Sequence, residues 1–380
     1  MLECCVKKLL LKRMLLIPLG IIAYAATWYA QGHPDWTEQA FSSTAYPVLS
    51  TAVGFLPSLV AFSVAEWLSG AFLLFCLGYV AYYVRKAVVD KGERGMTIYR
   101  GAMGAAAIAC AVYFAFTFLC GLNYYRCTFS SYTGYDVEQA NADPAQRQEE
   151  LAQLCSSLVD GLGRERALLG EDVDLFAAEP GEFEAYAHGT VSAMQGLAQE
   201  YPVLERPLYS PPKPVALSEL MSDAGLGGMF FPFTMESNVN AIEPFFTTPA
   251  TMAHELAHQC GFMREDEANF IAYLACTRTD DALMRYSGLL LAYDHSITAL
   301  SKADPERAAE VRAGLPAAVQ RDLAERAQFW DEHEGAILEA SQNMNDAYLK
   351  ANSQTDGLRS YGRMVDLLLA EQRAAEGAEE

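Results

Sequence analysis

Two histidines and a glutamate on one short segment have the residue types and spacing for metal chemistry. His254 and His258 are four positions apart in a run of good helix formers that follows Pro249. On a helix this spacing places both imidazoles on one face, where one tetrahedral Zn²⁺ can take a nitrogen from each. Glu255 lies about 100° around that helix, where a general base for a zinc-activated water would stand. The segment therefore predicts a zinc-dependent hydrolase.

Start and stop signals bound the helix that would carry these residues. Thr248 followed by Pro249 is typical of a helix start, with a hydroxyl at the N-cap and proline in the first turn. Gly261 is the residue type expected just past a helix end. We therefore expect the active-site helix at about 249–260, which is about three turns.

Two histidines leave a zinc ion short of one protein ligand, because a catalytic zinc usually has three. After Gly261, a second expected helix begins near Arg264 and offers three consecutive acids. An HExxH pattern also occurs by chance on a helix with one buried and one surface histidine. The helix signals and the acids downstream favour the metal site over that alternative.

The two helices together resemble those of the gluzincin peptidases. In that class the third ligand is a glutamate on the following helix, and an acidic or amide residue four positions later orients a histidine. The resemblance implies Glu265 as the third ligand and Asn269 as the orienting residue. Glu267 is the alternative ligand, although Ile271 occupies its matching position. Asparagine in place of the more usual aspartate implies a modest metal affinity.

Two further features are candidates for substrate handling, each with a structural alternative. Gluzincins commonly place an edge strand before the metal helix, and the stretch Phe230–Asn240 suits one or two short strands, or else aromatic core packing. Tyr286 is a candidate donor to the oxyanion of a tetrahedral intermediate, with ordinary packing as its alternative. His188 and His295 are expected to be surface or structural histidines.

Charge and apolar residues occupy different parts of the chain. The 380 residues are 52% hydrophobic and yet carry a net charge of −21. Residues 1–122 contain nine Lys/Arg and six Asp/Glu, so that 18 of the 27 basic and 42 of the 48 acidic residues fall in 123–380. So acidic a C-terminal body repels phosphate backbones, and we expect no nucleic-acid partner.

Three stretches in the N-terminal part are apolar and long enough to cross a bilayer core of about 30 Å. They lie at about 14–30, 67–84 and 102–122. A fourth run, 48–64, carries Pro57 and several hydroxyl residues. It predicts an interfacial or re-entrant piece, with spanning as the alternative.

Basic residues set the expected orientation of this anchor. Lys and Arg precede the first stretch and fill the loop after the second, but none lies between Gln31 and Glu66. Because basic loops stay in the cytoplasm, the N-terminus is expected inside and the body after the third span outside. We therefore predict a multi-pass plasma-membrane protein with an extracytoplasmic C-terminal domain, and the lipid bilayer as one partner.

Several blocks of the sequence resemble a bacterial membrane family known as domain of unknown function 3810. They are GLNYYR (121–126), PKPVALS (212–218), FPFTMESNVN (231–240), HELAHQCGFMREDEANF (254–270), RYSG (285–288) and SYGRMVDLL (360–368). The resemblance implies a membrane zincin, without a settled activity to carry over.

We therefore expect a mainly α protein with two parts. Residues 1–122 form a three-helix transmembrane anchor, and residues 123–380 form an α-rich, zincin-like metallohydrolase domain with a small sheet. The expected function is hydrolysis of peptides or cell-envelope proteins by a zinc-activated water with Glu255 as base. Two alternatives stay open: hydrolysis of another envelope amide such as a peptidoglycan cross-link, and a non-catalytic scaffold or sensor stabilised by zinc.

Overall fold

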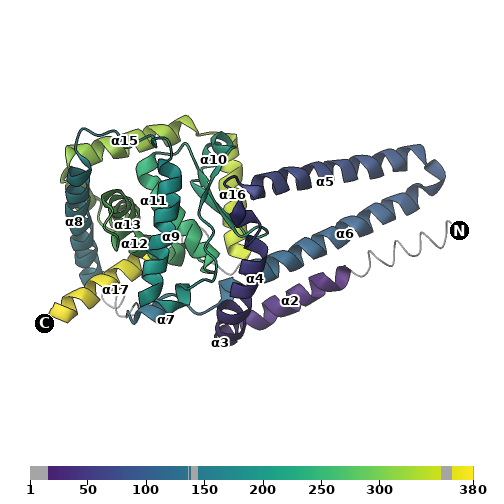
Figure 1. The fold of residues 1–380 in the computed structure, drawn as a ribbon, viewed down its shortest axis with the longest axis horizontal. Helices are drawn as coiled ribbons and strands as arrows, with labels where there is room; N and C mark the ends of the chain where they lie inside the picture. Colours follow the sequence, from purple (N-terminus) through teal and green to yellow (C-terminus); the bar gives the residue numbers. More distant parts are fainter. Residues whose placement is uncertain (1–15, 136, 138–143, 352–361, 380) are drawn as a thin grey trace. The chain divides into compact units, whose positions relative to one another are not determined.

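The protein is mainly helical, with one three-stranded sheet (Figure 1), as the sequence predicts. The computed structural model describes residues 16–135, 137, 144–351 and 362–379. These residues form two compact units. The first contains residues 16–53, 64–126 and 232–234, and the second contains 54–63 and the remaining described residues from 127 onward. Segment 54–63 therefore belongs with the C-terminal body, although in sequence it lies within the predicted anchor.

The regular elements of the first unit are all helical. They are α2 (Ile17–Gln31), α3 (Pro34–Trp36), the π-helix η1 (Thr37–Ala45), α4 (Tyr46–Gly54), α5 (Val64–Val89), α6 (Arg94–Leu119) and the short 3₁₀ turns η3 (Lys91–Glu93) and η4 (Gly121–Tyr125). A buried ion pair joins two of these elements, because Arg126, just after η4, donates from Nε and Nη2 to the Glu38 carboxylate of η1 at 2.8 and 2.6 Å. Bidentate, charge-assisted pairs of this kind fix the relative orientation of the two side chains and also add stability.

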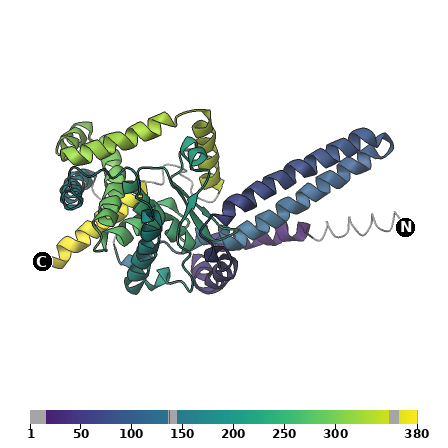
Figure 2. The ribbon, with the colours of Figure 1, turned by 45° about the horizontal axis from the view of Figure 1, so that its top comes forward.

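Two helices of this unit are long and apolar enough to cross a membrane, α5 and the helical stretch Lys91–Leu119 that contains α6. They cover the predicted stretches at 67–84 and, except for its last three residues, 102–122. Figures 1 and 2 show them as an antiparallel pair joined by a short turn. The hydroxyl of Tyr79 donates to the carbonyl of Gly101 across the pair at 2.7 Å.

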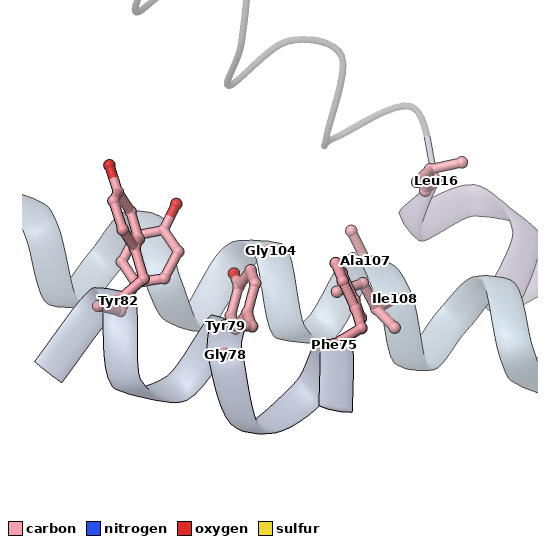
Figure 3. Close-up of a pocket in the computed structure, with 9 residues that line it drawn as sticks. Leu16, Phe75, Gly78, Tyr79, Tyr82, Gly104, Ala107 and Ile108 are labelled. Atoms are coloured by element: carbon pink, nitrogen blue, oxygen red, sulfur yellow. The ribbon is translucent and has the colours of Figure 1, made fainter. Parts of the chain in front are cut away.

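An apolar groove runs along this helix pair (Figure 3). It is lined by Leu16, Phe75, Gly78, Tyr79, Tyr82, Tyr83, Gly104, Ala107 and Ile108. Small residues on α6 let the α5 rings approach closely, and a Cβ at Gly101 would lie 3.0 Å from the Tyr83 ring. Small residues facing larger ones are typical of helices that pack within lipid.

The described part of the predicted first span at 14–30 lies in α2. Its 15 described residues reach about 22 Å at the helical rise, which is less than a bilayer core of about 30 Å. Met14 and Leu15 lie outside the described residues. Two described helices, and not the predicted three, therefore meet the requirements of length and composition.

The fourth apolar run, 48–64, is not one helix. Helix α4 ends at Gly54, and the 3₁₀ turn η2 (Pro57–Leu59) is followed by bends that lead to α5. Proline inside the run lacks an N–H and interrupts the helical ladder. Its entry into the membrane remains a prediction.

The second unit places a small sheet beside a bundle of helices. Its helical elements are α7 (Ser130–Thr133), α8 (Pro144–Leu169), α9 (Glu182–Glu200), η6 (Pro202–Leu204), α10 (Ser218–Asp223), η7 (Phe245–Thr247), α11 (Thr248–Gln259), α12 (Glu265–Thr277), α13 (Ala282–Ala303), α14 (Pro305–Ala313), α15 (Ala317–Glu332), α16 (Ala336–Ala351) and α17 (Gly362–Glu379). Helix α13 is central, because it packs against α8, α11, α12, α14 and α17. Figure 1 shows it nearly end-on among them.

The sheet has the order β1-β3-β2, with β1 (Lys213–Val215) parallel and β2 (Gly228–Phe231) antiparallel to β3 (Glu236–Asn240). All five residues of β3 are buried. Both β2 and β3 pack against α11. The sheet therefore lies against the helix that carries the two histidines of the motif.

A buried polar network ties α8, α13 and α15 together. The Arg166 guanidinium donates to Asp322 at 2.7 and 3.2 Å, and the Tyr286 hydroxyl donates to the same carboxylate at 2.7 Å. All three side chains are almost fully excluded from water. A buried arginine of this kind is strongly destabilising once its partner is removed.

We predict that Asp322→Leu lowers the stability of the unit by about 3–5 kcal/mol, because it leaves the Arg166 charge buried and unpaired. A loss of this size lowers the melting temperature of the detergent-solubilised full chain by roughly 6 °C or more. The control is Arg307→Ala, which breaks the exposed Arg307–Glu310 pair and is expected to change stability by less than about 1 kcal/mol. Equal melting temperatures for the two variants would contradict the prediction.

Candidate metal centre

Helix α11 begins and ends where its sequence signals indicate, within one residue. It runs from Thr248 to Gln259, so that Thr247 and not Thr248 is the N-cap, and proline lies in the first turn. Gly261 has a φ of 86°, a left-handed conformation that glycine adopts without steric cost. The turn reverses the direction of the chain after the helix, and the Phe262 carbonyl therefore lies 2.8 Å from His258 Nδ1.

Helix α11 and the first turn of α12 bring three ligand-type side chains together. Nε2 of His254 lies 3.3 Å from Glu265 Oε2, and Nε2 of His258 lies 3.7 Å from Glu265 Oε1. One ligand atom from each residue lies within 4.8 Å of the others. Two imidazoles and one carboxylate are a donor set that suits a catalytic zinc ion, which leaves a fourth position for water or substrate.

Hydrogen bonds to the other ring nitrogens orient both imidazoles. His254 Nδ1 lies 2.7 Å from Oδ1 of Asn269 on α12, and His258 Nδ1 faces the Phe262 carbonyl. Both partners are acceptors, so each Nδ1 carries the hydrogen and each Nε2 is directed into the cluster. Metal-binding histidines typically have such partners, which fix the tautomer and the ring orientation. The residues therefore fit a divalent metal ion of the zinc type.

The two candidate third ligands on α12 point to different places. Glu265 faces both histidines, whereas Glu267 is buried and its Oε1 accepts from the Phe129 backbone N–H and from Arg264 at 2.9 and 2.7 Å. Residues two apart on a helix are about 200° apart around its axis, so both cannot face α11. The structure brings Glu265 to the cluster and assigns Glu267 to packing contacts.

Glu255 lies under the edge strand β2. Its carboxylate accepts a hydrogen bond from the Phe230 backbone N–H, and its Oε2 is buried without a hydrogen-bond partner among the described residues. A Cβ at Gly228 would lie only 2.5 Å from Glu255 Oε1. Glycine at this position of β2 is therefore what lets the strand lie directly on the carboxyl group.

In the metal-free protein, the charges and burial of the three ligand residues determine which of them carries a proton. Burial disfavours the His254 imidazolium, but its hydrogen bond to Glu265 and the charges of Glu265 and Glu255 outweigh burial and raise the pKa of His254 to about 9. Burial and the positive His254 lower the pKa of His258 to about 4. Against the effect of burial, both imidazoles lower the pKa of Glu265 to about 2. At neutral pH, His254 and Glu265 therefore form an ion pair beside a neutral His258.

Burial acts in the opposite direction on the general-base candidate. It raises the pKa of Glu255 to about 8, and the charges of Glu265 and Glu243 add to this rise, while His254 and the Phe230 N–H oppose it. A carboxyl group with a pKa near the working pH can both take up and return a proton. This property suits a group that serves as base and then as acid.

Two residues near the cluster were not singled out by the sequence analysis as functional. Glu243 is buried, and burial raises its pKa to about 8. A Cβ at Gly227 would lie 2.6 Å from its Oε2. The pKa of His295 on α13 is lowered by burial, against the charge of Asp294, with a contribution from the positive His254. In the sequence, the Gly227–Gly228 pair was the one signal of a close contact here, because glycine in a strand often marks a place where another group approaches the backbone closely.

Tyr286, the predicted oxyanion donor, is not among the residues brought to the cluster. It is fully buried, and its hydroxyl donates a hydrogen bond to Asp322. Burial and that carboxylate raise its pKa further above its usual value. The side chain belongs to the network that joins α13 to α8 and α15, and these contacts agree with the packing alternative stated above.

Comparison with known proteins gives the chain a family. The family model described as "Protein of unknown function (DUF3810)" matches residues 41–369, and the chain belongs to this family. No curated protein and no solved structure matches it.

We predict that Asn269→Ala weakens zinc binding by roughly 10- to 100-fold, because His254 loses the acceptor that orients its ring. Asn269→Asp keeps an acceptor of the same shape and is expected to bind zinc at least as tightly as the wild type does. Competition with a zinc-sensitive chelating dye measures both constants. Equal affinities for the alanine variant and the wild type would show that Asn269 does not orient the ligand.

Zinc binding should also release a proton from His254. Below a pKa of about 9, the metal must displace that proton, so apparent affinity falls as the pH falls from about 9 to 6. We expect release of about one proton per zinc ion at pH 7 and progressively less above pH 9. Calorimetric titration in two buffers of different ionisation enthalpy measures this number. Release that is close to zero at pH 7 would contradict the ion pair between His254 and Glu265.

Proposed function

We propose that this protein is a membrane-anchored, zinc-dependent metallopeptidase with a zincin-like site. The observation that carries the proposal is the convergence of His254, His258 and Glu265, with Glu255 held beside them. The spacing on α11, the acceptor behind each imidazole and the shifted pKa of Glu255 all support it. Zinc, when bound, supplies a Lewis acid that polarises the scissile carbonyl and makes a water molecule more acidic.

In this proposal the chain's own residues bind, orient and move protons. His254, His258 and Glu265 hold the metal, and Asn269 fixes the ring of His254. Glu255 takes a proton from the attacking water and returns one to the leaving amine. Burial favours the protonated form of this carboxyl group, which suits a group that keeps the proton between the two steps.

An extended peptide along the outer edge of β2 is the proposed substrate geometry. Among the described residues, β2 pairs with one strand only, β3, and the Phe230 N–H on its other edge points to Glu255. A peptide added to this edge by backbone hydrogen bonds would carry its carbonyl groups past the carboxyl group. The buried Glu255 under Gly228 supports this arrangement.

The location proposed for this activity is the outer face of the plasma membrane. Helices α5 and α6 would supply two spans, and the predicted stretch at 14–30, of which α2 is the described part, would supply a third. Lys and Arg before the first span and between α5 and α6 favour a cytoplasmic side there. The unit with the cluster would then face outward, with peptides or cell-envelope proteins as the substrate class.

The decisive experiment compares wild type with Glu255→Gln in the zinc-loaded full chain, on a peptide library. We expect Glu255→Gln to keep one zinc per chain and to lose roughly 10²- to 10⁴-fold in hydrolysis rate. His254→Ala is expected to lose both zinc and activity. The control, Glu310→Gln on the exposed surface of α14, should hydrolyse at the wild-type rate.

Three results would overturn or redirect the proposal. Hydrolysis retained in Glu255→Gln would exclude the mechanism. A wild-type chain that cleaves wall-derived amides but no peptide would favour the other amide hydrolase. No turnover by any variant, together with unfolding of His254→Ala, would favour a scaffold in which zinc serves stability.

A further inference from the structure

Segment 54–63 leads from the end of α4 into α5. Its large apolar residues are exposed and its small residues are buried, which is the reverse of the usual pattern in a water-soluble protein. The ten residues, GFLPSLVAFS, contain no charged side chain. The buried members are Gly54, Pro57 and Ser63. The large apolar members are exposed: Phe55 by 54%, Leu56 by 71%, Leu59 by 66% and Phe62 by 54%. Four such residues in one short segment form the kind of apolar patch that marks an interaction surface.

Buried hydrogen bonds fasten this segment to the sheet of the second unit. Lys213 Nζ donates to the carbonyls of Pro57 and Phe62 at 2.6 and 3.2 Å and to Glu236 Oε1 at 2.6 Å. Its side chain is only 5% exposed. These three acceptors match the three N–H groups of an ammonium. The lysine is therefore satisfied only while the segment is in place.

A second anchor lies at the C-terminal end of the segment, directly after Phe62. Ser63 Oγ donates to Asn238 Oδ1 at 2.6 Å, and both residues are buried. Lys213 and Asn238 are register partners in β1 and β3. Strand β3 in turn pairs with β2, which lies on Glu255. The segment is thus bound through backbone and small side chains to the sheet beside the metal cluster, which leaves its large side chains outward.

We propose that segment 54–63 is a lipid-contacting platform whose exposed apolar residues enter the interfacial region of the bilayer. Val64, the first residue of α5, follows Ser63 directly. Helix α5 is apolar and only 6% buried over its apolar window, so its surface also requires lipid. The absence of Lys and Arg from 31–66 and the mixture of Phe and Leu suit insertion among acyl chains. The platform holds the sheet, and with it the cluster, at the membrane surface.

Photo-crosslinking in liposomes tests this contact without reference to activity. Benzoylphenylalanine is introduced at Leu56 or at Leu59 of the full chain in phosphatidylethanolamine–phosphatidylglycerol vesicles. The control is Leu168 on α8, which is 70% exposed and belongs to the same unit. After irradiation, mass spectrometry measures the fraction of chains that carry a lipid adduct.

We expect lipid adducts at positions 56 and 59 to exceed those at position 168 by at least about tenfold. Adduct yields equal to that at Leu168 would overturn the proposal. Crosslinked dimers in place of lipid adducts would also overturn it, because the patch would then be an interface between two copies. The measurement uses metal-free or metal-loaded protein alike, so its failure is distinct from failure of the peptidase proposal.

Hydrogen exchange in the same vesicles tests the anchors. Lys213→Met should accelerate amide exchange across 54–63 by more than about tenfold, and Ser63→Ala by roughly two- to tenfold. Lys302→Met, at an exposed lysine near the end of α13, is the control and should leave the segment unchanged. Ser63→Ala removes only the hydroxyl that donates to Asn238, and it keeps the test valid if Lys213→Met unfolds. Unchanged exchange in Ser63→Ala would show that the segment is not held as proposed.

Discussion

The contact of Glu265 with two imidazoles is the constraint around which the centre of the C-terminal unit is arranged. Glu255 and His258 are buried, and the side chains of His254 and Glu265 are only 16% and 20% exposed. Each isolated charge would be costly to bury. The cost is offset because His254 and Glu265 neutralise one another while Asn269 and the Phe262 carbonyl satisfy the remaining ring nitrogens. Helices α11 and α12 can pack closely only because these polar groups are matched.

Local signals were sufficient to predict the helix of the cluster and its partners. The i, i+4 histidines, the proline in the first turn and Gly261 specify α11 almost to the residue. The four-residue step from Glu265 to Asn269 predicts two side chains on one face of α12, and Asn269 does face His254. Periodicity fixes such relations because both residues lie on one rigid element. For the same reason the choice between Glu265 and Glu267 needed the structure, since it depends on how α12 is rotated against α11.

Long-range contacts account for the expectations that failed and for the features that were missed. Tyr286 was a candidate oxyanion donor, but its hydroxyl donates a hydrogen bond to Asp322, 36 positions along the chain. The importance of Gly228 depends on a carboxyl group from another element. The zincin-like fold and the zinc ion remain proposals.

The anchoring of segment 54–63 has a consequence for the order in which the chain folds. Lys213 and Asn238 follow their partners Pro57 and Ser63 by 156 and 175 residues, so the segment leaves the ribosome long before the strands that bind it. Contacts of such sequence separation close late, because the loop between them must first be ordered. Strands β1 and β3 of the sheet beside the cluster therefore bind a segment, 54–63, that was synthesised before them. Formation of the sheet beside the histidine cluster therefore depends on a segment that is synthesised more than 150 residues earlier.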